Sequence, residues 1–196
     1  MNYFEVFALP RRLGLDADDL QRRFYELSRR HHPDFHQAAP PEAQARALEA
    51  SALVNAAYRT LRDPIARVEY LLCLEEGRAA GDGADVKPAA PPALLAEMFE
   101  IQAALEEARS GGLDAAARAT LAAQRARLLE RSRDAERRLT GPLARAWDEG
   151  PEADRPCVLA ACREALATRA YLRTVIQDLS RALGEDEESS VSNRRH

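Results

Sequence analysis

Residues 16–34 read DADDLQRRFYELSRRHHPD, and this stretch predicts a helix that ends at a loop. Asp16 is a favoured N-cap residue, and the two aspartates that follow lie in the first turn, where the helix dipole favours carboxylates. The apolar residues recur at steps of four, three and four, the spacing of one helix face: Leu20, Phe24, Leu27 and His31. Pro33 ends the helix, because a proline pushes the residue before it out of the α region.

The neighbouring stretches also predict helices. Pro41 is favoured at the first position of a helix, and a stripe of small apolar residues continues from there to Leu61. Asp63-Pro64 is typical of a cap followed by a proline, so a further helix is expected to about Glu76. Residues 3–9 fit either a strand or a short helix, because length alone does not distinguish the two.

The second half of the chain has a different texture. Residues 77–92 are rich in glycine, proline and alanine without periodicity, as in a linker. Three longer helical stripes follow; Asp114 caps the second, Gly141-Pro142 kinks or breaks it, and the third ends at Leu183. Such seams predict an antiparallel three-helix coiled-coil-like bundle. The expected fold is all-α, with an N-terminal helical hairpin and flanking short helices in 1–76, a linker in 77–92, a bundle in 93–184 and a disordered acidic tail in 185–196.

The composition agrees with a folded helical protein. The chain is 46% hydrophobic but only 6% aromatic, and much of the apolar share is alanine, the best helix former. A net charge of −4 argues against nucleic acid as a partner, because phosphate binding needs a basic surface. No apolar run approaches the roughly 18 residues of a membrane span, and the N-terminal residues do not form a secretory leader. Three cysteines without a CxxC pair predict a cytoplasmic protein with neither disulfides nor a zinc site.

The tripeptide His32-Pro33-Asp34 carries the functional hypothesis, although alone it could be a simple helix stop and turn. Arginines precede it in the predicted helix: Arg22 and Arg29 project opposite the apolar stripe, and Arg23 and Arg30 flank them on one shoulder. Four guanidinium groups on one surface would steer and pair with the carboxylates of an acidic partner. The alternative is a solvated charged face.

Metal binding by the histidines around the tripeptide is a weaker hypothesis. His31, His32 and His36 are split by Pro33, and no cysteine or second histidine cluster supplies further ligands.

This arrangement resembles the J-domain of DnaJ-class co-chaperones, and over about 75 residues it resembles the HscB branch in particular. The resemblance is carried, besides the tripeptide, by YFEVFALP at 3–10, VNAAYRTLRDP at 54–64 and RVEYLL at 67–72. No Gly/Phe-rich stretch or cysteine-repeat zinc domain follows, unlike in a general-purpose DnaJ. Two positions depart from the usual J-domain pattern: His31 replaces an aromatic residue and Phe35 replaces a lysine.

The resemblance implies a co-chaperone of iron–sulfur cluster assembly that is not an enzyme and holds no cofactor. Its J-domain would bind a DnaK-family ATPase of the HscA type and stimulate hydrolysis through seven residues: His32, Pro33, Asp34, Arg22, Arg23, Arg29 and Arg30. Its bundle would bind an iron–sulfur scaffold protein of the IscU type through six: Leu95, Ala96, Phe99, Glu100, Ala103 and Tyr171.

The residues themselves also point to this bundle surface. Leu95 and Phe99 lie one position past the seam, about 100° round the helix, and Tyr171 and Val175 stand off the last seam in the same way. The alternative is a broad buried face of a helix that packs against two neighbours.

Three other functions are weighed against this reading. A J-protein could deliver a different client to a general DnaK-family chaperone. An enzyme is disfavoured, because the sequence contains no phosphate loop, metal-ligand cluster or nucleophile motif. A purely structural coiled-coil protein would leave the tripeptide and the arginines unexplained.

Overall fold

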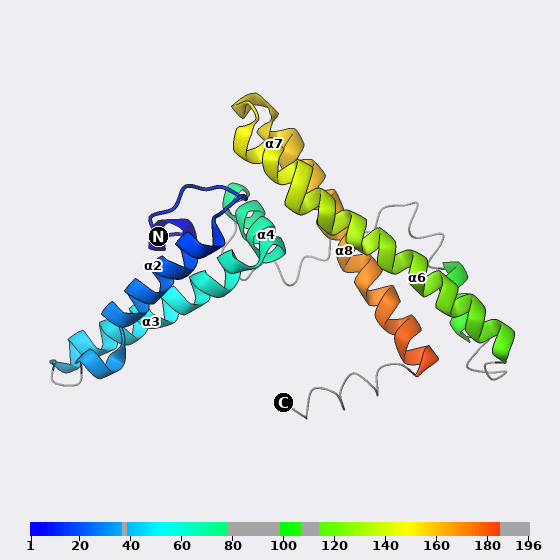
Figure 1. The fold of residues 1–196 in the computed structure, drawn as a ribbon, viewed down its shortest axis with the longest axis horizontal. Helices are drawn as coiled ribbons and strands as arrows, with labels where there is room; N and C mark the ends of the chain where they lie inside the picture. Colours follow the sequence, from blue (N-terminus) through cyan, green and yellow to red (C-terminus); the bar gives the residue numbers. More distant parts are fainter. Residues whose placement is uncertain (37–38, 78–98, 107–113, 185–196) are drawn as a thin grey trace. The chain divides into compact units, whose positions relative to one another are not determined.

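The computed structural model describes residues 1–36, 39–77, 99–106 and 114–184 (Figure 1). Those ranges are helical throughout, apart from turns and connections, and contain no strand, so the predicted all-α fold is confirmed. The contacts divide the chain into two compact units: Met1–Asp85 with Leu139–Leu159, and Val86–Arg138 with Ala160–His196. The predicted linker, apart from Gly77, and the predicted tail lie outside the described residues.

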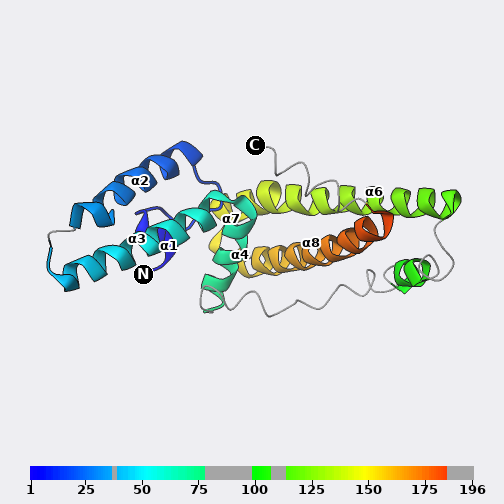
Figure 2. The ribbon, with the colours of Figure 1, turned by 90° about the horizontal axis from the view of Figure 1, so that it is seen from below.

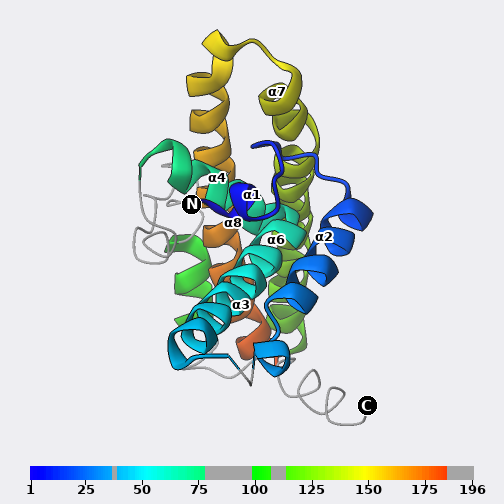
Figure 3. The same ribbon diagram turned by 90° about the vertical axis from the view of Figure 1, so that its left-hand side faces the viewer.

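The first unit is built on a helical hairpin. Its helices α2 (Ala17–Arg30) and α3 (Pro41–Arg62) lie side by side, and the short 3-10 helix η1 (Pro33–His36) connects them (Figures 1 and 3). A short helix α1 (Tyr3–Val6) packs against α3, and α4 (Pro64–Glu75) follows α3 directly. Residues 3–6 are therefore helical rather than a strand.

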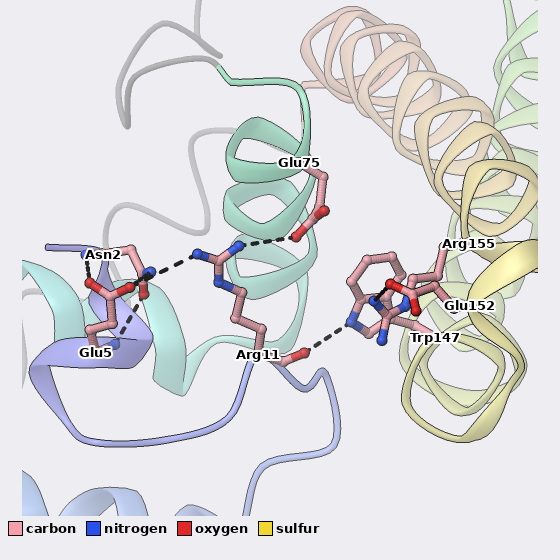
Figure 4. A network of polar contacts seen from close by, with 7 residues as sticks. All are labelled: Asn2, Glu5, Arg11, Glu75, Trp147, Glu152 and Arg155. Atoms are coloured by element: carbon pink, nitrogen blue, oxygen red, sulfur yellow. Dashed lines mark hydrogen bonds and ion pairs between the residues drawn. The ribbon is translucent and has the colours of Figure 1, made fainter.

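Local side-chain caps explain where these helices begin. The Asp16 carboxylate accepts from the N–H groups of Asp18 and Asp19 at 2.9 and 3.2 Å, as the sequence predicts. Asp63 caps α4 in the same way. The ambiguous α1 has a capping box: the Asn2 side chain accepts from the Glu5 N–H, and the Glu5 carboxylate accepts from the Asn2 N–H (Figure 4).

The core of the first unit is aromatic and aliphatic. Its large side chains are fully buried and come from all four helices and the turn after α1: Phe4, Phe7, Leu20, Leu61 and Leu71. Tyr3 stacks on Tyr70 with ring centroids 4.3 Å apart, and the Tyr70 hydroxyl accepts from the Tyr3 N–H. Burial raises the pKa of the Tyr70 phenol, so this hydroxyl stays neutral at physiological pH.

A segment from the second half of the chain, residues 139–159, completes this unit. After α6 (Ala115–Arg138) the chain forms a π-helical turn η3 (Leu139–Leu143) that contains Pro142, then α7 (Ala144–Glu149) and a 3-10 turn η4 (Glu152–Asp154). The sequence places residues 139–159 in the bundle, within 93–184, whereas their contacts group them with the N-terminal residues. The predicted break at Gly141-Pro142 takes the form of the π turn.

Polar bonds between α7 and the loop at residues 10–14 explain this grouping. The Asp148 carboxylate accepts from the N–H groups of Leu13 at 2.8 Å and Gly14 at 2.7 Å. The Trp147 indole N–H donates to the Arg11 carbonyl at 3.0 Å, and the Arg11 guanidinium reaches Glu75 of α4 (Figure 4). A Cβ at position 14 would lie 3.0 Å from the Asp148 carboxylate, so glycine gives this carboxylate its room.

The second unit is a bundle of three helices. They are residues 99–106, α6, and the part of α8 (Arg155–Leu183) after Leu159; α6 and α8 lie side by side (Figure 2). All three contribute to one buried apolar cluster: Ile101, Leu105, Leu121, Leu128, Leu172, Val175, Leu179 and Leu183. Arg169 of α8 pairs with Glu136 of α6 at 2.7 Å. The predicted three-helix bundle is confirmed.

No helix within these described ranges combines the length and the apolar character that crossing a bilayer requires.

The replacement Asp148→Ala should lower the free energy of unfolding of the first unit by about 1–3 kcal/mol. The N–H of the buried Leu13 would lose its acceptor, and an unsatisfied buried donor costs about this much. Trp147 is the chain's one tryptophan and is buried in this unit, so its fluorescence during urea unfolding measures the effect directly. The control is Glu149→Ala, an exposed carboxylate next to it; equal midpoints for the two variants would contradict the structural role of Asp148.

Candidate functional site

The tripeptide His32-Pro33-Asp34 lies at the turn between α2 and α3, with both polar side chains exposed. The Phe35 N–H donates to the His32 carbonyl at 3.1 Å, which closes the turn. The His32 Nδ1 accepts from the Asp34 N–H at 3.3 Å and lies 3.6 Å from the Asp34 carboxylate. The turn therefore orders two polar groups without burying them.

Phe35 adds an apolar surface beside these two groups. Its ring is largely exposed and meets the His32 ring edge to face, with centroids 6.1 Å apart. An aromatic side chain here, where J-domains often carry a lysine, makes the turn less basic and more apolar.

The structure separates the four predicted arginines into two groups. Arg22, Arg29 and Arg30 are exposed on α2, and Arg22 pairs with Asp19 one turn earlier. Arg23 is only partly exposed: its guanidinium donates to Asp19 at 2.9 Å and to the carbonyls of Phe7 and Ala8. These intramolecular bonds give Arg23 a structural role. Its contact with a chaperone remains a prediction, and less of its side chain is exposed than in the other three arginines.

The bonds of Arg23 hold an unfavourable turn. Ala8 has a φ of 50°, in the left-handed region that residues with a Cβ rarely adopt. The Arg23 guanidinium binds the carbonyl of this residue and that of Phe7, and so joins α2 to the turn after α1.

The structure adds Tyr25, an aromatic residue that the sequence did not predict as part of a site, to the face that carries the arginines. Tyr25 is 61% exposed and lies with Arg22, Glu26 and Arg29 around a shallow depression on the outer side of α2. Its position in the sequence could have indicated an exposed binding residue, because Tyr25 is a bulky aromatic residue outside the apolar stripe.

Tyr25 also borders a larger groove of about 690 Å³ between α2 and α3. The α2 side of this groove consists of Gln21, Phe24 and Tyr25, and the α3 side of Asn55, Tyr58, Arg59 and Arg62. Phe24, which the sequence assigns to the buried stripe, is only partly buried and stacks on Tyr58 at 4.0 Å. The groove depends on the pairing of two helices, and the periodicity of either helix alone does not reveal it.

The predicted scaffold-binding residues lie on the bundle, as far as the structure describes them. Phe99 is 74% exposed, and Glu100 and Ala103 are exposed beside it, whereas Ile101 and Leu105 of the same helix are buried. Tyr171 is partly buried against the apolar cluster that contains those two residues. Val175 belongs to that cluster, so the expectation that it stands off the seam is wrong. Leu95 and Ala96 lie outside the described residues.

The candidate metal ligands and the cysteines can be located in the described part of the chain. No three residues among its His, Cys, Asp and Glu side chains are grouped as a metal site requires. Cys73 and Cys162 are buried and Cys157 is exposed. Burial raises the pKa of the Cys162 thiol to about 11, which leaves it protonated at neutral pH.

Comparison with known proteins agrees with this geometry. A family model described as the DnaJ domain matches residues 2–70. The structure of the chaperone HscB from Vibrio cholerae is 28% identical, with a TM-score of 0.61, over 95% of this chain and 99% of that one. The human co-chaperone protein HscB has the same fold, at 23% identity and a TM-score of 0.58, over 92% of this chain and 81% of that one. Residues 2–70 thus match a DnaJ domain, and nearly the whole chain, with its DnaJ domain and its three-helix bundle, is similar in fold to the chaperone HscB.

Proposed function

We propose that this protein binds an iron–sulfur scaffold protein of the IscU type, brings it to a DnaK-family ATPase of the HscA type, and stimulates that ATPase to promote cluster transfer. The observation that carries the proposal is the exposed His32-Pro33-Asp34 turn at the end of an arginine-bearing helix, in a chain that aligns with an HscB structure over 95% of its length.

The J-domain would act in two steps on the ATPase. First, Arg22, Arg29 and Arg30 attract an acidic surface, because exposed charges of one sign steer an oppositely charged partner. Then His32 and Asp34, already ordered by their turn, make short-range polar contacts with the docked ATPase. Hydrolysis belongs to the ATPase, and the J-domain residues alter its rate only through contact.

The bundle would hold the scaffold through Phe99. An aromatic side chain that is 74% exposed beside a small residue, Ala103, and a carboxylate, Glu100, has the size and surroundings of an interface anchor. Tyr171 would add a second aromatic contact. The family resemblance supports the identity of the scaffold protein. The exposure of Phe99, Glu100 and Ala103 supports this surface as its binding site.

A second candidate function is the delivery of a different client to a general DnaK-family chaperone. It shares the J-domain chemistry and differs only in what the bundle binds. Capture of the full chain's partners from a lysate, identified by mass spectrometry, with a Phe99→Ser variant as the control, distinguishes the two functions.

The tripeptide variants His32→Gln and Asp34→Asn should each return the stimulated rate of ATP hydrolysis to the basal rate, because the first replaces the exposed imidazole and the second the exposed carboxylate of the turn by an uncharged amide. A steady-state ATPase assay, with and without the scaffold, measures this. Circular dichroism should show unchanged helicity, since neither side chain is buried. Stimulation equal to that of the unmodified protein would refute the J-domain proposal.

Replacing Arg22 and Arg29 together with Ala should slow association with the ATPase by roughly tenfold at low ionic strength, because the pair supplies electrostatic steering. The association rate of the unmodified protein should also fall as salt rises, since screening shortens the reach of exposed charges. Stopped-flow binding measures both. The matched control replaces Arg127 and Arg138 with Ala, two exposed arginines of α6, and so removes the same charge. If the control slows association equally, net charge alone explains the effect and the steering by Arg22 and Arg29 is contradicted.

The replacement Phe99→Ser should weaken scaffold binding by about 2 kcal/mol, the cost of removing an interface hot spot. Helicity should be retained, because Ile101 and Leu105 keep the helix in the bundle. Isothermal titration with the purified scaffold measures the affinity, and Glu106→Ser, an exposed position on the same helix, is the control. Unchanged affinity would place the scaffold on another surface.

A further inference from the structure

The groove between α2 and α3 has an aromatic floor. Phe24 and Tyr58 stack nearly parallel, with ring centroids 4.0 Å apart and planes 12° apart. The ring centroids of Tyr25 and Phe24 are 5.6 Å apart, and Tyr25 is 61% exposed, so its ring forms an open edge of the groove. Three aromatic side chains thus face one depression of about 690 Å³ without closing it.

The other side of the groove is cationic. Arg59 and Arg62 lie nearly one turn apart on α3, and the Arg62 guanidinium lies over the Tyr58 ring, 5.7 Å from its centroid. The amide of Gln21 donates to the Tyr25 hydroxyl at 3.2 Å and fixes the edge of that ring. No carboxylate is among the residues that line the groove, so the arginines are not neutralised within it.

This combination selects a particular ligand chemistry. Guanidinium groups bind carboxylates with two parallel hydrogen bonds, and aromatic rings accept an aliphatic or aromatic side chain. An extended peptide segment with a carboxylate next to an apolar side chain satisfies both sides of the groove at once. Aromatic residues and arginine in one concavity are also the residue types that dominate binding energy at protein interfaces.

The groove is continuous with the surface already proposed for the chaperone. Tyr25 lines both this groove and the depression between Arg22 and Arg29 on the outer side of α2. A partner that covers the α2 arginines therefore meets Tyr25 and then the groove. Its attraction to those arginines already requires an acidic surface, which is the chemistry that Arg59 and Arg62 also require.

We propose that the α2–α3 groove is a second docking site for the DnaK-family ATPase, and that it binds an acidic segment that carries an apolar side chain next to its carboxylate. This inference rests on the proposed function. It assigns Arg59, Arg62 and Tyr25 to the interface, with Tyr25 as the residue shared by both contacts.

The test compares full-length variants for affinity to the purified ATPase and for stimulation of its activity. Arg59→Gln with Arg62→Gln, and separately Tyr25→Ala, should each weaken binding by about tenfold or more, as expected for interface hot spots. Arg46→Gln, an exposed arginine on the same helix outside the groove, is the matched control and should bind as the unmodified protein does. Circular dichroism and Trp147 fluorescence establish that each variant is folded.

The outcomes separate this inference from the proposed function. If the unmodified protein binds and stimulates, Asp34→Asn abolishes stimulation, and the groove variants match Arg46→Gln, the groove inference alone is overturned. If the unmodified protein does not bind the ATPase, both fail. Light scattering gives a third result: a dimer that the groove variants convert to a monomer would assign the groove to a second copy and overturn the inference.

A photo-crosslinking amino acid at position 25 supplies an independent readout in the assembled complex. The crosslinked peptide of the ATPase, identified by mass spectrometry, should contain an aspartate or glutamate adjacent to an apolar residue. Crosslinks only to peptides without this pairing would overturn the proposed chemistry.

Discussion

The buried guanidinium of Arg67 connects the elements of the first unit. Its Nε donates to the carbonyl of Leu61, the penultimate residue of α3, at 2.7 Å, and its Nη1 donates to the carbonyl of Leu13 in the loop before α2. Burial lowers the pKa of this guanidinium, while the carboxylates of Asp148 and Asp63 oppose the shift. An arginine retains its charge under such conditions, so its carbonyl partners and Asp148 compensate a charge that would otherwise be costly to bury. The loop, the end of α3 and α7 are therefore interdependent.

This arrangement determines how α2 is presented. The residues before α2 are held by Asp148 and Arg67, and Arg23 joins the first half of the helix to the turn after α1. The opposite end of α2 carries the His32-Pro33-Asp34 turn, in which the His32 ring accepts from the Asp34 N–H and the His32 carbonyl accepts from the Phe35 N–H. One end of the helix is thus anchored in the unit, while the other exposes the groups proposed to contact the ATPase.

Neighbouring residues of one type consequently have different tasks. Arg22 and Arg23 are adjacent in the sequence, yet Arg22 is exposed beside Tyr25 and Arg23 is bound to carbonyls. The same holds for Phe24 and Tyr25, of which one forms the floor of the groove and the other its open edge. A basic, aromatic helix can therefore supply both internal bonds and an external binding surface within a single turn.

The sequence by itself determined the features that depend on nearby residues. Helix starts at Asp16, Asp63 and Asp114 follow from caps that act within three positions, and the bundle seams follow from periodicity, because a cap or a stripe needs no distant partner. The resemblance to J-domains and the position of the tripeptide after a helix were predictable for the same reason, because short motifs carry both. Only the tertiary structure decided that Asp148 binds the Leu13 N–H, 135 positions away, that Arg23 turns inward, and that Phe24 meets Tyr58 across an open groove. Those contacts depend on which elements meet in space, and the periodicity of a single helix specifies the face that is buried but not the partner that buries it.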